Sequence, residues 1–187
     1  MKHIFKPYGI PSSIKEEIIS NWEKIKDDYL SLEDSDSIDY EEDNKFYSEK
    51  NKWKVFKLRN YPFGEKLNEH KCEYTHKLLD KIPRLKGAAF STLKPNSKIK
   101  AHKGLKDSTI RHHLGLIVPP DTWIKIGGEN HFWEEGKIFS FDDSILHEVF
   151  NLSDKKRVIL IFDVQNRFSL KWFLLKLLIK LKIIKIT

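Results

Sequence analysis

Apolar residues recur at helical spacing near the start of the chain, at Ile14, Ile18, Ile19, Trp22 and Ile25. Such a stripe is typical of an amphipathic helix, here over about residues 14–31, that packs its apolar side on a core. Ser13 and Glu16 have the spacing of a capping box, which would mark the start of this helix. The acidic stretch 32–43, with seven acids and no base, then interrupts the pattern and reads as a solvated loop.

After this acidic stretch the apolar positions come in short runs. A strand is predicted over Trp53 to Leu58, and a short helix near residues 73–81 that Pro83 would stop. From Gly87 onward, short runs alternate with turn residues, and they predict seven strands at 87–93, 98–102, 109–118, 122–127, 136–141, 146–151 and 156–165. Short strands at close spacing favour an antiparallel sandwich or barrel over a βαβ fold.

The last stretch, residues 170–186, is apolar but interrupted by lysines that fall on two opposite sides of a helical wheel. Its longest uncharged run is far shorter than the ~20 residues of a spanning helix. Two interpretations stay open: a helix that packs on the domain, and an interfacial anchor whose lysine stems reach past the apolar layer. The first residues contain no long apolar run, so we expect neither a secretory signal nor an N-terminal anchor.

Length and composition narrow the picture further. A chain of 187 residues is long enough for one domain with its own core. The single cysteine, Cys72, excludes a disulfide within this sequence and a thiolate zinc site, and fits a reducing, cytoplasmic location. The net charge of +7 is concentrated in residues 165–187 and would favour an anionic partner such as a membrane surface, contacted through residues 170–186. No nucleic-acid motif accompanies it, so specific nucleic-acid binding is not expected.

Two histidines are candidates for chemistry because both lie at the margins of predicted strands. His102 ends one strand and His147 begins another, and strand ends at the mouth of a barrel can converge on one ion. Two histidines are too few for a closed structural zinc site, so a metal here would keep open coordination positions.

Arg157 opens a predicted buried strand, where its permanent charge requires an anion. One explanation is an internal salt bridge, for which Asp142, Asp143 and Asp163 are available. The other is bidentate capture of a substrate carboxylate. The side chains able to bind anions on the predicted strands, with two of them on one strand face, are Ser91, Arg111, His113 and Arg157, and together they indicate a dicarboxylate pocket.

The motifs of this half of the chain form a recognisable series. In chain order they are Ser91, Pro95, His102-x-Gly104, Arg111-His-His-Leu-Gly-Leu, Trp133-Glu-Glu-Gly-Lys, Phe141-Asp-Asp-Ser, His147-Glu-Val and Arg157. From about Trp53 to Asp163 the series resembles the aspartyl/asparaginyl β-hydroxylase family. The resemblance implies a mainly β fold, a double-stranded β-helix (jelly-roll or cupin-like barrel) with flanking helices at the N- and C-termini. It also implies iron(II), molecular oxygen and 2-oxoglutarate as co-substrate.

Residue roles follow from the resemblance by position. His102 and His147 would be the catalytic iron ligands. The residues that would contact 2-oxoglutarate are Trp53, Ser91, Arg111, His112, His113 and Arg157, with Ser91 and Arg157 at its far carboxylate. The usual pattern of two histidines and a carboxylate expects an acid two residues after His102. Gly104 stands there instead, as in the family, so water would fill that position, and Asp142 and Asp143 are interpreted as supporting or turn residues.

The expected organisation has three parts: an N-terminal helix and acidic loop (1–50) packed on the core, the double-stranded β-helix (51–167), and a basic apolar C-terminal helix (168–187). Family members that act on secreted domains carry an N-terminal anchor and a helical-repeat region, which this sequence does not show. The first hypothesis for the substrate is still an Asp or Asn side chain in a peptide or protein. The alternatives are an acyl chain of a lipid A-type molecule at a membrane surface and, from another class, a catalytically inactive barrel that binds a partner.

Overall fold

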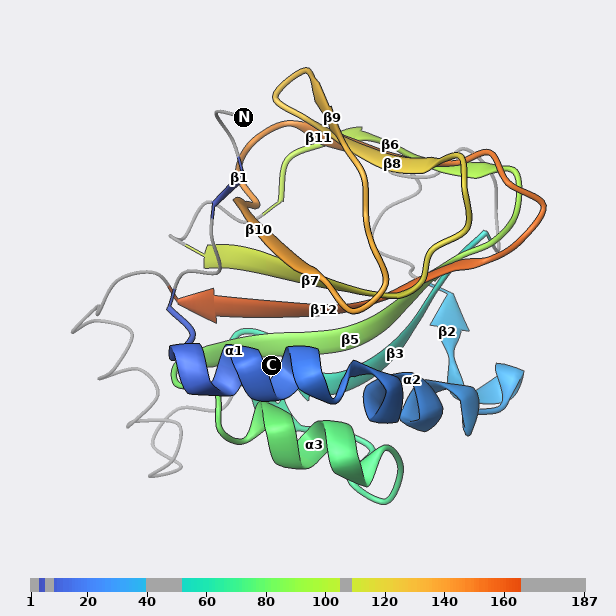
Figure 1. Ribbon diagram of the computed structural model, residues 1–187. Helices are drawn as coiled ribbons and strands as arrows, with labels where there is room; N and C mark the ends of the chain where they lie inside the picture. Colours follow the sequence, from blue (N-terminus) through green and yellow to red (C-terminus); the bar gives the residue numbers. More distant parts are fainter. Residues whose placement is uncertain (1–3, 6–8, 40–51, 105–108, 166–187) are drawn as a thin grey trace.

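Two antiparallel β-sheets face each other, and three helices cover the outer side of the larger sheet (Figure 1). The computed structural model describes residues 4–5, 9–39, 52–104 and 109–165. The helices are α1 (Ser12–Ser20), α2 (Trp22–Leu30), the short 3₁₀ helix η1 (Asp34–Asp36) and α3 (Glu73–Leu79). The strands are β1 (Ile4–Phe5), β2 (Ile38–Asp39), β3 (Trp53–Asn60), β4 (Glu65–Lys66), β5 (Leu85–Leu93), β6 (Ser97–His102), β7 (Thr109–Ile117), β8 (Thr122–Ile126), β9 (Glu129–His131), β10 (Ile138–Asp142), β11 (His147–Asn151) and β12 (Arg157–Gln165).

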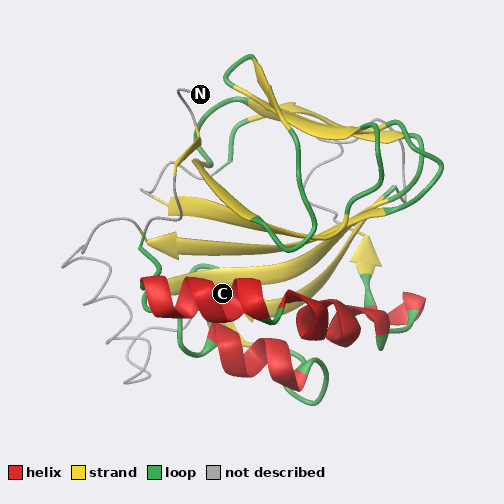
Figure 2. Cartoon of the chain, in the orientation of Figure 1, coloured by secondary structure: helices red, strands yellow, loops and turns green. Residues whose placement is uncertain are grey.

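The strand order defines the fold. The major sheet runs β1-β10-β7-β12-β5-β3-β2, with β4 beside β3, and the minor sheet runs β6-β11-β8-β9. Figure 2 shows both sheets in yellow, with the helices on one side only. From β5 to β8 and from β10 to β12, consecutive strands belong alternately to the two sheets. This topology is that of a double-stranded β-helix. This confirms the fold class that the sequence predicted.

The major sheet separates two cores because side chains along its strands alternate between its two faces. Along β12, Val158, Leu160, Phe162 and Val164 join an apolar cluster with residues of the three helices, which we call the outer core. Ile159, with Ile161 against it, packs in a second cluster between the sheets together with Trp53 and Trp133, which we call the inner core. The space between the sheets is therefore partly filled, and the remainder is bounded by polar side chains.

Most sequence predictions of local structure are confirmed. All seven predicted strands and the strand at Trp53 are present, as is the helix near residues 73–81. The predicted capping box is wrong: α1 begins at Ser12, its N-cap is Pro11, and no side chain caps it. The single predicted helix over 14–31 is two helices, because Asn21 leaves helical geometry and its amide donates to the Glu17 carbonyl at 2.8 Å.

Two further predictions concern the ends of the chain. The C-terminal helix expected over 168–187 lies outside the described residues. Within the residues that the structure describes, no helix is both long and apolar enough to cross a membrane.

Candidate active site

His102 and His147 are neighbours across the minor sheet. His102 is the last residue of β6 and pairs in register with His147, the first residue of β11, and their ring centroids lie 4.2 Å apart. Nδ1 of His102 lies 2.7 Å from the Lys100 carbonyl, and Nδ1 of His147 lies 2.8 Å from the Ile145 carbonyl. A carbonyl oxygen only accepts, so each Nδ1 carries the proton and each Nε2 keeps a lone pair. The sequence placed both histidines at strand margins, and the structure brings them together.

Both imidazoles are held in the form that binds metals. Burial lowers the pKa of His102 below its usual value. Burial and, secondarily, the neighbouring His102 lower the pKa of His147 to about 3. Neutral imidazole is the ligand form, so neither ring has to lose a proton before it can coordinate a cation near neutral pH.

Asp143 lies beside these histidines, close to the place where an acid after His102 would stand. Its Oδ1 is 3.7 Å from His147 Nε2, and its backbone carbonyl accepts the Gly104 N–H at 2.8 Å. A Cβ on Gly104 would overlap the Asp143 carboxylate. The glycine thus makes room for an acid that arrives from a distant part of the chain. Asp142, in contrast, accepts the Ser144 N–H at 2.9 Å, which fits its interpretation as a turn residue.

The residues present fit an open metal site. Two imidazole Nε2 atoms with a carboxylate nearby are suited to a divalent transition metal such as iron(II). Within the described part of the chain, no cluster of three or more His, Cys, Asp or Glu side chains could hold a metal ion. The two Nε2 atoms would be nitrogen ligands for such a metal, and its other coordination positions would be open.

Arg157 is buried without a carboxylate partner. It is 1 % exposed, and its Nη1 donates to the Ser91 carbonyl at 3.4 Å. Its guanidinium lies 5.0 Å from the Trp133 ring centre, and Nε has no hydrogen-bond partner among the described residues. Burial lowers the pKa of Arg157 to about 9, which still leaves the group charged near neutral pH. None of the described carboxylates forms an ion pair with it, so the internal salt bridge considered from the sequence is absent.

Two tryptophans orient side chains that line the same small space as Arg157. Trp53 donates from Nε1 to Ser91 Oγ at 2.9 Å, which leaves the Ser91 hydroxyl hydrogen free to point elsewhere. Trp133 donates from Nε1 to His113 Nδ1 at 3.3 Å, so the His113 proton sits on Nε2. That buried Nε2 has no partner in the part of the chain described. Burial, first of all, lowers the pKa of His113 well below its usual value, so the ring is neutral.

Arg111 is already held by two acids. Its Nε and Nη2 donate to the two oxygens of Asp163, both at 2.9 Å, and its Nη1 lies 2.8 Å from Asp143 Oδ1. Burial raises the pKa of Asp163, and the Arg111 guanidinium opposes this rise. The sequence assigned Arg111 to the co-substrate. In the structure Nε and Nη2 donate to Asp163, and the third nitrogen forms an ion pair with Asp143, the carboxylate beside the two histidines.

His112 lies on the opposite face of the sheet from its neighbours. Its ring stacks on Phe162 in the outer layer, with centroids 4.9 Å apart, and its Nδ1 bonds Ser140 Oγ at 2.6 Å. Arg111 and His113 face the space between the sheets. The structure therefore separates His112 from the predicted co-substrate residues, because consecutive strand residues point to opposite faces.

The site comprises two adjoining spaces. A small inner space of about 20 Å³ is lined by both histidines and by residues that the sequence assigned to the co-substrate, including Ser91, His113 and Arg157. A larger cavity of about 420 Å³ opens beside it and includes Gly104 and Asp143. The residues that line both spaces are Trp53, His102, Arg111 and Ile161. The inner space holds about one water molecule, so a dicarboxylate would have to spread its walls or extend into the larger cavity.

Comparison with known proteins gives first the class and then the family. A structure of a 2OG-Fe(II) oxygenase family oxidoreductase from Burkholderia pseudomallei superposes with a TM-score of 0.59 at 10 % identity, over 79 % of this chain and 80 % of that one. This likeness shows the fold alone, a double-stranded β-helix. The family model for aspartyl/asparaginyl beta-hydroxylase matches residues 19–167. The chain belongs to this hydroxylase family, as the motif series indicated.

Two relatives show the range of the family. Over 128 residues the chain is 38 % identical to the ornithine lipid ester-linked acyl 2-hydroxylase of Rhizobium tropici, covering 67 % of this chain and 46 % of that protein. Over 153 residues it is 33 % identical to human aspartyl/asparaginyl beta-hydroxylase, covering 77 % of this chain and 20 % of that protein. The chain thus spans less than half the length of either curated relative.

Proposed function

We propose that this chain is an iron(II)- and 2-oxoglutarate-dependent hydroxylase that acts on an unactivated C–H bond. The observation that carries the proposal is Arg157, a charged group buried without a carboxylate partner in a space that His102 and His147 also line. A buried cation of this kind is stabilised by an anion that enters from outside. A dicarboxylic co-substrate beside a two-histidine metal site meets that need.

The overall reaction consumes 2-oxoglutarate, oxygen and substrate R–H, and yields succinate, carbon dioxide and R–OH. Bound iron(II) supplies the redox chemistry that couples decarboxylation to C–H hydroxylation. The keto acid loses one carbon as carbon dioxide, one oxygen atom enters succinate and the other enters the product. No protein nucleophile is consumed in this balance.

The protein side chains bind and orient. His102 and His147 would hold the iron through Nε2, with both rings fixed by their Nδ1 bonds to carbonyls. Arg157 would form charge-assisted hydrogen bonds with the far carboxylate of 2-oxoglutarate, joined by the Ser91 hydroxyl that Trp53 orients. His113 would donate from Nε2 to the near end of the same molecule.

Arg111 and Asp143 have a supporting role in this proposal. Arg111 fixes the Asp143 carboxylate through its Nη1 and keeps it beside the histidines. The Asp143 carboxylate occupies the space where a Cβ on Gly104 would lie, from which it would accept hydrogen bonds at the metal site. His112 has no contact with 2-oxoglutarate in this proposal because its ring packs on Phe162 in the outer layer.

The test is succinate formation from 2-oxoglutarate by the purified chain with iron(II) and oxygen. We expect His102→Ala and His147→Ala to abolish it and to weaken iron binding, measured separately by equilibrium dialysis. His112→Asn is the matched control, since it removes a buried histidine from the other face and should leave turnover intact. If either alanine variant bound iron and turned over as the wild type does, that histidine would not be a ligand. A wild type with neither activity nor iron binding would favour the inactive barrel.

Two substrate classes follow from the two relatives. The first proposal is an Asp or Asn side chain in a peptide or protein, in line with the family's name and the human relative. The second is a lipid acyl chain, favoured by the 38 % identity to an acyl 2-hydroxylase and by apolar side chains such as Val55, Ala89 and Ile161 along the larger cavity. Mass spectrometry for a product that gains one oxygen atom, among Asp- or Asn-containing peptides and among lipids, decides between them.

A further inference from the structure

A second hollow lies on the outer side of the major sheet, away from the active site. It measures about 350 Å³, and its lining includes Tyr29, Asp34, Lys54, Thr92, Lys94 and Lys156. This volume lies within the range of small-molecule sites, roughly 300–1,000 Å³. The structure thus contains a pocket to which neither the family nor the motifs assign a role.

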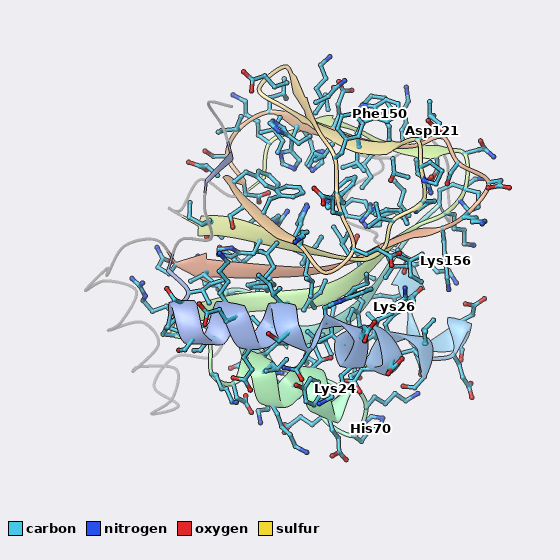
Figure 3. All side chains as sticks on the ribbon, in the orientation of Figure 1. Lys24, Lys26, His70, Asp121, Phe150 and Lys156 are labelled. Carbon is cyan, nitrogen blue, oxygen red and sulfur yellow. The ribbon has the colours of Figure 1, made fainter. Side chains whose placement is uncertain are left out.

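The fold brings its three lysines together from separate strands. Lys54 of β3 pairs in register with Thr92 of β5, and Lys156 directly precedes β12, the other neighbour of β5. Lys94 follows the end of β5. These three side chains therefore surround one corner of the sheet, and α2 closes it from below with Tyr29. Figure 3 labels Lys156 at this corner, above α2.

The charge of the hollow is strongly positive. No ion pair joins Lys54, Lys94 or Lys156 to a carboxylate within the described parts of the chain. Lys54 Nζ lies 3.5 Å from the Asp34 carbonyl, and Lys156 Nζ lies 5.0 Å from the Tyr29 ring centre. The exposed Asp34 offsets only one of the three positive charges. Converging ammonium groups of this kind attract an anion.

Hydroxyl groups at the floor add a free donor. Tyr29 Oη and Thr92 Oγ1 lie 3.1 Å apart, and either can be the donor of their hydrogen bond. One hydroxyl hydrogen is used in that bond, so the other remains free for an acceptor in the hollow. Both side chains are buried, which fixes the position of this donor. The edge of the Tyr29 ring also packs against Phe90, with centroids 5.5 Å apart.

We propose that this hollow binds the phosphate group of a phosphate monoester. At neutral pH such a group carries about −1.5 to −2 charges and three acceptor oxygens, which matches three ammonium groups, one offset by Asp34, and a hydroxyl donor. Lysine binds phosphate as a point charge, without the planar fork that favours arginine for carboxylates. The phosphate could belong to a soluble metabolite or to a lipid headgroup.

The hollow lies behind the co-substrate residues on the same strand ends. Trp53, Ser91 and Arg157 face the space between the sheets, and their chain neighbours Lys54, Thr92 and Lys156 face outward. A ligand on the outer side would therefore not compete for the groups proposed to bind 2-oxoglutarate. Phosphate binding does not depend on the proposed hydroxylase reaction and can be tested without iron.

The experiment titrates the full chain calorimetrically with glycerol 3-phosphate at low ionic strength, in a buffer free of phosphate. Vesicles of phosphatidylcholine with and without phosphatidic acid form the second arm, read by co-sedimentation. We expect saturable binding in at least one arm, weakened at least tenfold in the variant Lys54→Gln/Lys156→Gln. Binding of the soluble probe points to a metabolite, and binding only to phosphatidic acid vesicles points to a lipid headgroup.

The controls separate a built pocket from general charge. Lys24 lies 5.2 Å from the Tyr74 ring centre, over α3, much as Lys156 lies over Tyr29, but it is outside the hollow. Lys24→Gln/Lys77→Gln removes the same charge and should leave binding unchanged. The double variant Tyr29→Phe/Thr92→Val keeps the charge and the ring but removes both hydroxyls, and should weaken binding about fivefold, as expected for one lost hydrogen bond. The proposal is overturned if neither probe binds, if the control variant weakens binding equally, or if Lys54→Gln/Lys156→Gln folds normally and binds as the wild type does.

Discussion

The two faces of the major sheet use the same strands for opposite purposes. On β12 the outer face carries Val158, Leu160, Phe162 and Val164, which pack under the helices. The inner face carries Arg157 and Asp163, which are both buried, and Asp163 accepts two hydrogen bonds from Arg111. A shift of the strand by one residue would exchange these two sets, so the register is fixed by the outer core. Packing of the apolar outer face therefore fixes the positions of Arg157 and Asp163 on the inner face.

The adjacent histidines His112 and His113 show what separates the faces. Both are buried, burial lowers the pKa of both, and both have an Nε2 without a partner among the described residues. An unpartnered atom therefore does not by itself identify a site. The difference is the surroundings: His112 lies against the Phe162 ring, whereas His113 lines the same space as Arg157.

The largest effect on stability should come from the outer face. Phe162→Ala removes a fully buried ring between β12 and the helices, and should lower the free energy of unfolding by about 3–5 kcal/mol. Chemical denaturation measures this. The matched change Ile161→Ala on the inner face truncates a half-buried side chain and should cost less. Equal losses would mean that the two faces do not divide stability and chemistry as described.

Arg157→Ala should act on binding rather than on folding. If Arg157 binds 2-oxoglutarate as proposed, the variant should raise the 2-oxoglutarate concentration for half-maximal turnover at least about tenfold, since a lost charged pair costs roughly 2 kcal/mol or more. Arg157→Lys keeps the charge without the planar guanidinium, so its 2-oxoglutarate concentration for half-maximal turnover should lie between those of the wild type and the alanine variant. An unaltered requirement in the alanine variant would contradict the carboxylate role.

His112 should contribute a pH dependence of stability. Burial lowers its pKa to about 3 from an unfolded value of 6.5, so between these pH values the unfolded chain binds the extra proton. The corresponding stability is complete above pH 6.5 and is lost as the pH falls toward 3. Replacing His112 by Asn should remove a slope of up to about 1.4 kcal/mol per pH unit in this window. An unchanged slope in denaturation curves measured across the window would place the titration elsewhere.

The smallest effect concerns Cys72, which is part of the outer core. Burial, with Asp28 as the next cause, raises the pKa of its thiol to about 12, so almost no thiolate forms at neutral pH. Alkylation of the folded chain at pH 7.5 should therefore be very slow and should become rapid in denaturant. Rapid modification of the native chain, followed by mass spectrometry, would show that this part of the outer core opens readily.

Local patterns in the sequence predicted the elements well. Apolar periodicity located the seven strands and the helices because burial on one face leaves a repeating pattern. It did not reveal β9, which is short and polar, or the break at Asn21, where an amide competes for the helix backbone. These features depend on a few hydrogen bonds rather than on a repeating pattern.

The motifs indicated candidate site residues but not the contacts between them. The pairing of His102 with His147 and the approach of Asp143 to Gly104 join segments about 40 residues apart. The resemblance implied that the two histidines meet, but the sequence contained no signal for the approach of Asp143 to Gly104. The resemblance assigned both His112 and Arg111 to the co-substrate. In the structure His112 packs against Phe162 on the outer face, and Arg111 forms ion pairs with Asp143 and Asp163.

We propose above all that Arg157 binds the far carboxylate of 2-oxoglutarate beside an iron site formed by His102 and His147. The most direct test is calorimetric titration of 2-oxoglutarate into the iron(II)-loaded chain without oxygen. We predict saturable binding that is at least about tenfold weaker in Arg157→Ala, and that falls strongly without metal or in His102→Ala. Absence of binding, or binding equally tight in Arg157→Ala and in the metal-free chain, would contradict the claim.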